Sequence, residues 1–179
     1  SANMNDNIFE KMTNQLRETI DSSVALALHN KNQEVQIVHL IWALLTNTNS
    51  VLNQLLNKMN VNKAAIELEA KSNASKLPSV SSVTKESIKL SRELYESFQK
   101  AEGQMASNGD KFIAIDTWLI SNFDNKVIKD ILGKYIDLKE AKKELEALRA
   151  GKQIDSQSGD DNLEALNKYG IDLNKKAID

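Results

Sequence analysis

The chain has 179 residues, of which 41% are hydrophobic and 27% are charged, and its formal net charge at pH 7 is -2. The length suits one domain with a continuous apolar core, and the charge argues against nucleic acid as a partner, because phosphate binding needs an excess of Lys and Arg. Cysteine is absent, which excludes disulfides, thiolate metal sites and thiol nucleophiles and fits a reducing, cytoplasmic location. No stretch approaches the ~20 apolar residues of a membrane-spanning helix. Residues 1–3, which precede Met4, are interpreted as a cloning remnant.

Helical periodicity dominates the first half of the chain. From Phe9 to Ala27, apolar or small residues recur at spacings of three and four, which predicts a long first helix that ends near the polar residues 29–32. Residues 35–45 are strongly apolar and predict a second helix. The polar residues 46–50 favour caps and turns, so they should end it.

Two further helices and a connection complete this half. Residues 51–56 restart the helical pattern, and Asn62 is positioned to cap a fourth helix that runs through Ala70. Pro78, the only proline, lies in the serine-rich stretch 75–82, whose composition is typical of a connection. We therefore expect the chain to divide into two similar halves at Pro78.

The second half repeats the pattern of the first. The matching pairs of segments are 51–59 with 127–135, 35–45 with 112–122, and 16–28 with 88–105. Each copy of such a four-helix unit would expose an apolar stripe if it stood alone. The two copies should therefore pack together into an all-α, pseudo-twofold domain with a groove between them.

The boundaries follow from this duplication. We assign the first repeat to residues 4–76 and the second to residues 84–149. Residues 150–161 are polar, contain glycine and have almost no apolar anchors, which predicts a flexible linker in a flexible C-terminal tail. Residues 162–179 carry a short helical pattern with too little apolar surface to fold alone, and we interpret them as the start of a further domain.

Several segments carry a family resemblance. The run 25–28, the polar loop after it and the apolar run 38–45 resemble the first repeat of Clp amino-terminal domains, and residues 108–113 resemble the loop that leads into the second repeat. Residues 163–173, with the pattern Ala-Leu-x-Lys-Tyr-x-Ile-Asp-Leu, are similar to the segment that begins the first ATPase module of ClpB-type protein disaggregases. The resemblance covers nearly the whole chain.

The resemblance implies a function. It implies a double Clp amino-terminal domain that captures unfolded or aggregated polypeptides in a groove and delivers them to a homohexameric ATPase ring, which works with a partner chaperone. ATP and Mg²⁺ would bind to ATPase modules outside these residues, so we expect this part of the protein to be a monomer with no enzymatic activity and no cofactor of its own. An alternative within the same family is the docking of a dedicated adaptor protein.

By resemblance, three polar residues are assigned to substrate handling: Thr13, Asp110 and Asp116. At the last position the family more often has glutamate, and the sequence leaves open whether the shorter Asp116 replaces it functionally. Phe112 and Ile115 are added as apolar residues that would line the groove. The alternatives are that both aspartates cap the helix that begins near Phe112, that the threonine is merely tolerated inside a helix, and that the apolar pair packs in the core.

Other residues with chemical potential are interpreted as structural. His29 and His39 lie ten positions apart without a neighbouring ligand in a metal-binding spacing, so we expect no metal site and a structural hydrogen bond for His39. A small hydrolase that pairs His39 with Asp116 is a third hypothesis, although no nucleophile accompanies the pair. The sequence has no phosphate-binding loop of the form G-x-x-x-x-G-K-[ST]. Trp42 and Trp118 should be core residues whose indole N–H groups need partners.

Overall fold

The structure is a computed structural model that describes residues 8–160. Its helices after residue 13 are α2 (Asn14–His29), α3 (Ile37–Thr46), α4 (Val51–Lys58), α5 (Lys63–Ser75), α6 (Arg92–Asn108), α7 (Ile115–Ser121), α8 (Lys126–Ile131) and α9 (Leu138–Arg149). Two short strands, β1 (Glu34–Val35) and β2 (Lys89–Leu90), precede α3 and α6. The fold is thus almost entirely helical, as predicted, and the predictions for residues 1–3 and 162–179 lie outside the described residues.

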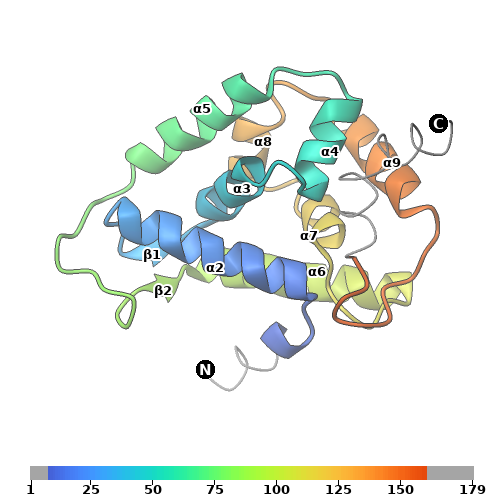
Figure 1. Cartoon of the computed structure of the whole chain (residues 1–179), viewed down its shortest axis with the longest axis horizontal. Coiled ribbons are helices and arrows are strands. Elements are labelled where there is room, and N and C mark those ends of the chain that lie inside the picture. Colours follow the sequence, from blue (N-terminus) through green and yellow to red (C-terminus); the bar gives the residue numbers. More distant parts are fainter. Residues whose placement is uncertain (1–7, 161–179) are drawn as a thin grey trace, which may run out of the picture.

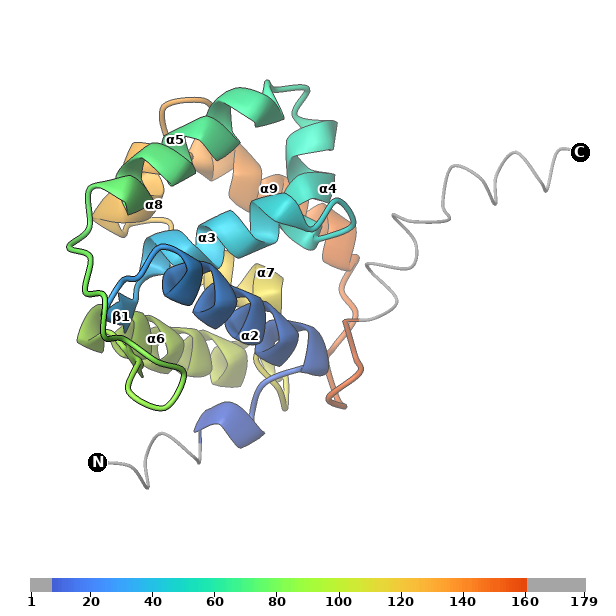
Figure 2. The same cartoon turned by 60° about the vertical axis from the view of Figure 1, so that its left-hand side comes forward.

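The helices are arranged in layers. Figures 1 and 2 show α3 and α7 between α2 and α6 on one side and α4, α5 and α9 on the other. Of the helices that begin after residue 13 in the described part of the chain, four precede Pro78 and four follow it, which agrees with the predicted duplication. Between residues 8 and 160, no helix combines the length and the apolar character needed to cross a membrane.

The first long helix begins later than the periodicity predicts. Thr13 has an extended backbone, and its hydroxyl accepts a hydrogen bond from the Leu16 N–H at 3.2 Å, so it caps α2 from outside. The helix therefore starts at Asn14 and not near Phe9, and residues 8–10 form a separate helical turn. The alternative that Thr13 lies inside a helix is wrong.

The other boundaries of the first half differ only slightly from the prediction. α3 begins two residues late, because Val35 lies in β1 and contributes its backbone to strand pairing. Asn62 caps α5 as predicted, through a hydrogen bond from the Ala65 N–H at 3.1 Å. α5 continues to Ser75 and does not end at Ala70, since Ala74 is fully buried and anchors its last turn.

Two parallel backbone pairings join the halves and make the twofold relation visible. Met12 pairs with Ile113, and Val35 pairs with Leu90. Leu90 lies 78 positions after Met12, and Ile113 lies 78 positions after Val35. Each pairing thus joins the residues before the first helix of one half to the residues before the second helix of the other. A twofold rotation that places each half on the other would therefore also place the Met12–Ile113 pairing on the Val35–Leu90 pairing.

One core runs through both halves. α3 contacts α8, and α4 contacts α7 and α9, so the helices of each half pack on those of the other. Trp118 of α7 is fully buried, and its ring centroid lies 6.4 Å from that of Phe98 on α6. Buried side chains of both halves belong to a single hydrophobic cluster. Each half therefore buries its apolar stripe against the other, which is the packing that the repeat predicts.

Residues 150–160, which we call the strap, differ from the flexible linker predicted for 150–161. Ala150 and Gly151 both have left-handed backbones, with φ of 55° and 74°, and turn the chain back after α9. The Lys111 N–H donates to the Ile154 carbonyl at 2.8 Å, and the Asn14 N–H donates to the Gln157 carbonyl at 2.7 Å. The strap lies beside the start of α2 and the end of α6 (Figure 2). The expectation of a free linker is wrong for these residues, because their backbone groups find partners that composition does not reveal.

Candidate functional site

Asp110 is positioned by the end of α6. Gly109 ends this helix with a left-handed backbone, φ 76°, which no residue with a Cβ adopts as easily, and the chain turns sharply there. The Asp110 side chain is 1% exposed. One of its oxygens accepts the Ile154 N–H at 2.9 Å, and the other lies 2.8 Å from Nη1 of Arg149.

Asp116 is the second residue of α7 and faces the same arginine. The Arg149 Nε donates to Asp116 Oδ2 at 3.0 Å and Nη2 donates to Oδ1 at 2.8 Å, which is the bidentate geometry of the strongest carboxylate pairs. Nη2 also lies 3.2 Å from the Thr117 hydroxyl. The two aspartates singled out in the sequence are thus brought together by a third residue that was not predicted.

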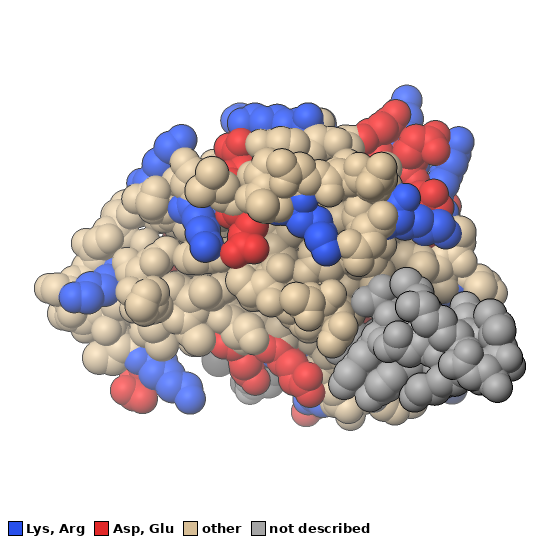
Figure 3. Space-filling model, turned by 45° about the horizontal axis from the view of Figure 1, so that its top comes forward, with Lys and Arg blue, Asp and Glu red and all other residues tan. Residues whose placement is uncertain are grey.

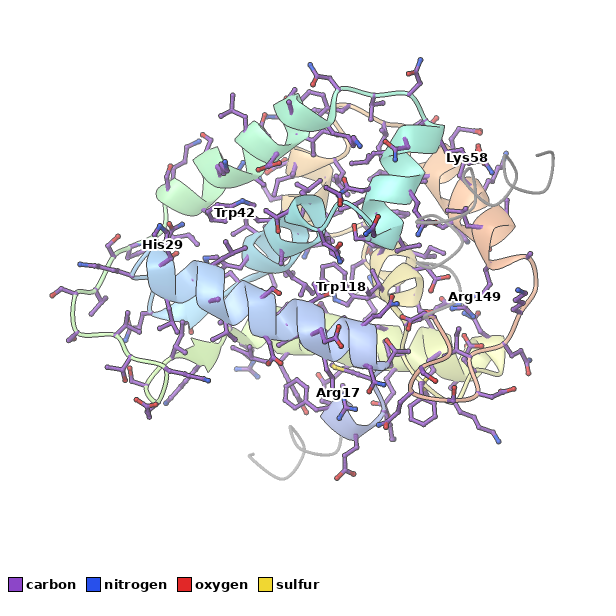
Figure 4. The ribbon with its side chains drawn as sticks, viewed as in Figure 1. Arg17, His29, Trp42, Lys58, Trp118 and Arg149 are labelled. Atoms are coloured by element: carbon purple, nitrogen blue, oxygen red, sulfur yellow. The ribbon has the colours of Figure 1, made fainter. Side chains whose placement is uncertain are left out.

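The charges in this cluster stabilise one another. Burial by itself lowers the pKa of Arg149, but the hydrogen bonds and the attraction of Asp116 and Asp110 outweigh it and raise that pKa above its usual value. The arginine side chain is 12% exposed, and the guanidinium remains charged. Figure 4 shows Arg149 at the end of α9, next to the segment that continues from it.

A cleft of about 360 Å³ adjoins this cluster. It is bounded by α6, α7, α9 and the first residues of the strap, and its lining includes Gln104, Asn108, Ile120, Lys142, Glu146 and Gln153 as well as the three charged residues of the cluster. Two larger or similar hollows, of about 760 and 300 Å³, lie at the connection near Pro78 and between α2 and α3. Of these three hollows, only the cleft of about 360 Å³ contains residues that the sequence singled out as functional, namely Asp110 and Asp116.

Thr13 lies at the other end of the strap. Its side chain is fully buried, and its hydroxyl donates to Asp160 at 2.9 Å. Its backbone N–H donates to the Ile113 carbonyl at 3.0 Å. Thr13 is therefore connected to the 110–113 loop through the backbone, but it does not line the cleft.

The two apolar candidates have different environments. Phe112 is half-buried in the loop before α7, whereas Ile115 is 3% exposed and belongs to the hydrophobic core. Neither residue lines the cleft. For Ile115 the structure therefore agrees with the alternative of ordinary core packing.

Helix capping explains the aspartates only in part. The N-cap of α7 is Ala114, whose side chain makes no cap. Asp116 accepts the Thr117 N–H at 2.8 Å, so it does satisfy one amide of the first turn. Asp110 bonds to the strap and to Arg149 and does not cap the helix.

His39 and Asp116 do not form the pair that a hydrolase would need. His39 is fully buried, with Nδ1 accepting the Gln36 N–H at 2.9 Å and Nε2 2.9 Å from the Asn32 side-chain oxygen. Burial lowers its pKa to about 4. Asp116 is engaged by Arg149 instead. The structural hydrogen bond expected for His39 is confirmed, and within residues 8–160 no group of three or more potential metal ligands is found.

The tryptophans are core residues with unequal polar contacts. Trp118 donates its indole N–H to the Ser97 hydroxyl at 2.8 Å. Trp42 is 8% exposed, and its indole nitrogen has no hydrogen-bond partner in the described part of the chain. Figure 4 labels the two residues at separate places in the molecule, Trp42 near α5 and Trp118 near α7.

The outer surface carries charges of both signs. Figure 3 shows Lys and Arg interspersed with Asp and Glu on the face that it displays. Exposed pairs such as Lys58 with Glu144, 3.4 Å apart and linking α4 to α9, each contribute about 0–1 kcal/mol. This mixed pattern does not favour a strongly charged partner.

Comparison with known proteins identifies related chains. The family model described as the Clp repeat (R) N-terminal domain matches residues 11–135. The chaperone protein ClpB of Wolinella succinogenes is 54% identical over 173 residues, and that of Helicobacter hepaticus is 51% identical over 173 residues. Both alignments cover 97% of this chain and 20% of the relative. The chain therefore spans about a fifth of the length of these relatives.

Solved structures agree on the fold. The Hsp104 N-terminal domain from Candida albicans superposes with a TM-score of 0.75 at 21% identity, covering 84% of this chain and 99% of that one. A ClpV N-domain in complex with a VipB peptide gives a TM-score of 0.64 at 15% identity, covering 82% of this chain and 92% of that one. At these identities the likeness establishes the shared fold.

Proposed function

This chain belongs to the family of Clp repeat N-terminal domains, and we propose that it is the substrate-binding amino-terminal domain of an ATP-dependent protein disaggregase. Relatives at 54% and 51% identity that are named as ClpB chaperones support the proposal. In it, the domain captures unfolded or aggregated polypeptides and delivers them to a homohexameric ring. The ring, its ATP and Mg²⁺, and the partner chaperone belong to the rest of a parent protein that we expect in the cytoplasm.

The observation that carries the proposal is the cleft between α6, α7 and α9. It combines the apolar side chain of Ile120 with the side-chain amides of Gln104, Asn108 and Gln153. Amides can donate to and accept from an extended backbone, and the apolar residue can contact the hydrophobic side chains that unfolded proteins expose. Arg149 is already paired, and the other charged residues of the lining, Lys142, Glu146 and Lys152, carry both signs, so the cleft favours no single charge on its ligand. Binding should therefore be weak and tolerant of sequence.

The residues assigned by resemblance take distinct roles in this proposal. Phe112, which is half-buried, is available for apolar contact with a client. Asp110 and Asp116 hold Arg149 in the wall of the cleft and do not contact the client through a free carboxylate. Since Asp116 makes a bidentate pair with the arginine, we propose that it serves functionally where the family more often has glutamate.

A nuclear magnetic resonance titration tests the proposal. We expect reduced and alkylated lactalbumin, which has no folded state, to shift the amide signals of residues 104, 108, 120 and 153 in the 179-residue chain. Native lactalbumin should shift none of them. Ile120→Asp should weaken the interaction about tenfold, because a charge placed in the apolar part of the cleft must be desolvated on binding.

The matched control is Leu68→Asp on α5, because Leu68 is 67% exposed and does not line the cleft. It should bind like the unsubstituted chain. Signal changes centred on the hollow near Pro78, or equal losses of binding in both variants, would contradict the proposal.

Docking of a dedicated adaptor is the second candidate. It is favoured by the structure of a ClpV N-domain with a VipB peptide, which shares this fold. Immobilised chain, incubated with lysate, should retain many proteins in small amounts if clients are the ligands. Retention of one protein in stoichiometric amount would favour the adaptor.

A further inference from the structure

The strap contacts the body of the domain along its whole length. From its start to its end, it accepts hydrogen bonds at the Lys152 carbonyl from Arg149, at the Ile154 carbonyl from Lys111, at the Gln157 carbonyl from Asn14, and at the Asp160 carboxylate from Thr13. It also donates the Ile154 N–H to Asp110 and the Gln157 amide to the Glu10 carbonyl. The side chain of Ile154 is 1% exposed.

The residues assigned to substrate handling are the anchors of this segment. Asp110 bonds the strap directly and is itself held by Arg149, which also grips Asp116. Thr13 holds the far end. We propose that these four residues form a clamp that docks the strap, with Arg149 as the positioning residue that orients Asp110 toward the Ile154 N–H.

The docked strap also shapes the cleft. Gly151, Lys152 and Gln153 form part of its lining, so one wall of the cleft exists only while the strap is docked. The Gln153 amide nitrogen lies 2.9 Å from the position that a Cβ would take at Gly109, which shows how closely the strap approaches the end of α6. Docking of the strap and occupancy of the cleft are therefore linked. This second part rests on the proposed function, whereas the clamp itself does not.

Spin labels can measure docking directly, because the chain has no cysteine of its own. Labels on Asp155→Cys in the strap and Glu96→Cys on α6, both exposed positions, should give a narrow distance distribution in the 179-residue chain. Arg149→Gln should broaden it, because Asp110 loses the partner that orients it. Lys143→Gln, an exposed change on the same helix, should leave it narrow.

Two further measurements separate release of the strap from loss of the fold. A label pair on Lys71→Cys and Glu96→Cys reports on the body alone and should stay narrow in every variant. Ile154→Asp leaves the clamp residues in place but puts a charge at a buried strap position, and it should broaden the Asp155 distances as Arg149→Gln does. A broad distribution in the unsubstituted chain, or narrow ones in both variants, would overturn the clamp.

The linkage to the cleft is tested with the same unfolded lactalbumin. If the linkage is correct, Ile154→Asp should weaken lactalbumin binding about tenfold. Saturating lactalbumin should also narrow the distribution of distances between the labels at positions 155 and 96 in the chain that is otherwise unsubstituted. Equal binding with and without a docked strap would overturn the linkage. Absence of binding in the unsubstituted chain would instead refute the proposed function and leave the clamp standing on the distance data.

Discussion

Arg149 is one positive charge between two buried carboxylates, so its immediate surroundings carry a formal excess of one negative charge. Backbone N–H groups of Ile154 and Thr117 donate to the same carboxylates and offset that excess with their dipoles. Removing one member of such a buried set costs more than an exposed ion pair contributes, because the remaining charges stay out of water. For this reason the cluster can hold the strap in place and also shape the wall of the cleft.

The sequence identified two members of this cluster and missed the third. Asp110 and Asp116 were found through resemblance. Arg149 lies in a helix rich in Lys and Glu, where a basic residue near the end is normally solvated and serves the helix dipole. Its partners are 33 and 39 positions away, and no local spacing rule connects such distant residues. A buried aspartate implies a cation somewhere, but only the fold identifies which one.

His39 provides a pH prediction. Because its pKa in the folded chain is lowered from 6.5 to about 4, the unfolded chain binds more protons between these values, and stability must fall as the pH drops through this window. Between pH 7 and pH 5 we expect a loss of about 2 kcal/mol from this residue. Urea unfolding at both pH values measures it.

Substitution of His39 separates its contribution from that of the other titratable groups. His39→Gln should reduce the loss between pH 7 and pH 5 by about that amount, whatever it does to stability at pH 7. An unchanged pH dependence in His39→Gln would show that the imidazole is not kept neutral by burial.

At the level of elements, periodicity located the helices but missed the starts of α2 and α3, whereas α4 begins at Val51 as predicted. α2 begins after Phe9 and α3 after Val35 for one reason: the residues just before each helix pair through their backbone with residues of the other half. Those backbone bonds are long-range, so an apolar pattern that suits a helix cannot reveal them. Asn62, whose cap depends only on residues three positions away, was predicted correctly.

Two glycines, one inside α6 and one just after its end, should respond in opposite directions to the same substitution. Gly109→Ala should destabilise the domain by about 1–2 kcal/mol, because its left-handed backbone is unfavourable for a residue with a Cβ and the Gln153 side chain occupies the space. Gly103→Ala should stabilise it by about 0.5–1 kcal/mol, since the position is helical and open. Thermal unfolding of both variants measures the difference. Equal effects would contradict the assignment of Gly109 as a conformational requirement.

At the level of the whole molecule, the duplication could be predicted because it is written into the apolar pattern of both halves. The backbone pairings between the halves could not be predicted from the sequence. The pairings of Met12 with Ile113 and of β1 with β2 involve only one or two residues on each side, and such short pairings leave no pattern in the sequence. The docked strap was missed for a similar reason, since Ile154 is its one fully buried apolar residue and a single apolar residue gives no pattern.

Because each half completes the core of the other, neither should fold alone. Cleavage of the chain in the connection between Ser82 and Val83 should leave far-ultraviolet circular dichroism unchanged, since neither residue lies in a helix or in the buried core. The separated halves should lose most of their helical signal, and mixing them should restore it. A half that unfolds cooperatively by itself would show that the repeats are independent domains.

The contact between Thr13 and Asp160 also has a mechanical consequence. A pull on the chain beyond residue 160 meets this bond first, then the bonds of Gln157, and then those of Ile154. These hydrogen bonds would break one after another, before the pulling force reached α9 and the core. The strap would thus detach at low force, lengthen the connection and protect the helices from unfolding.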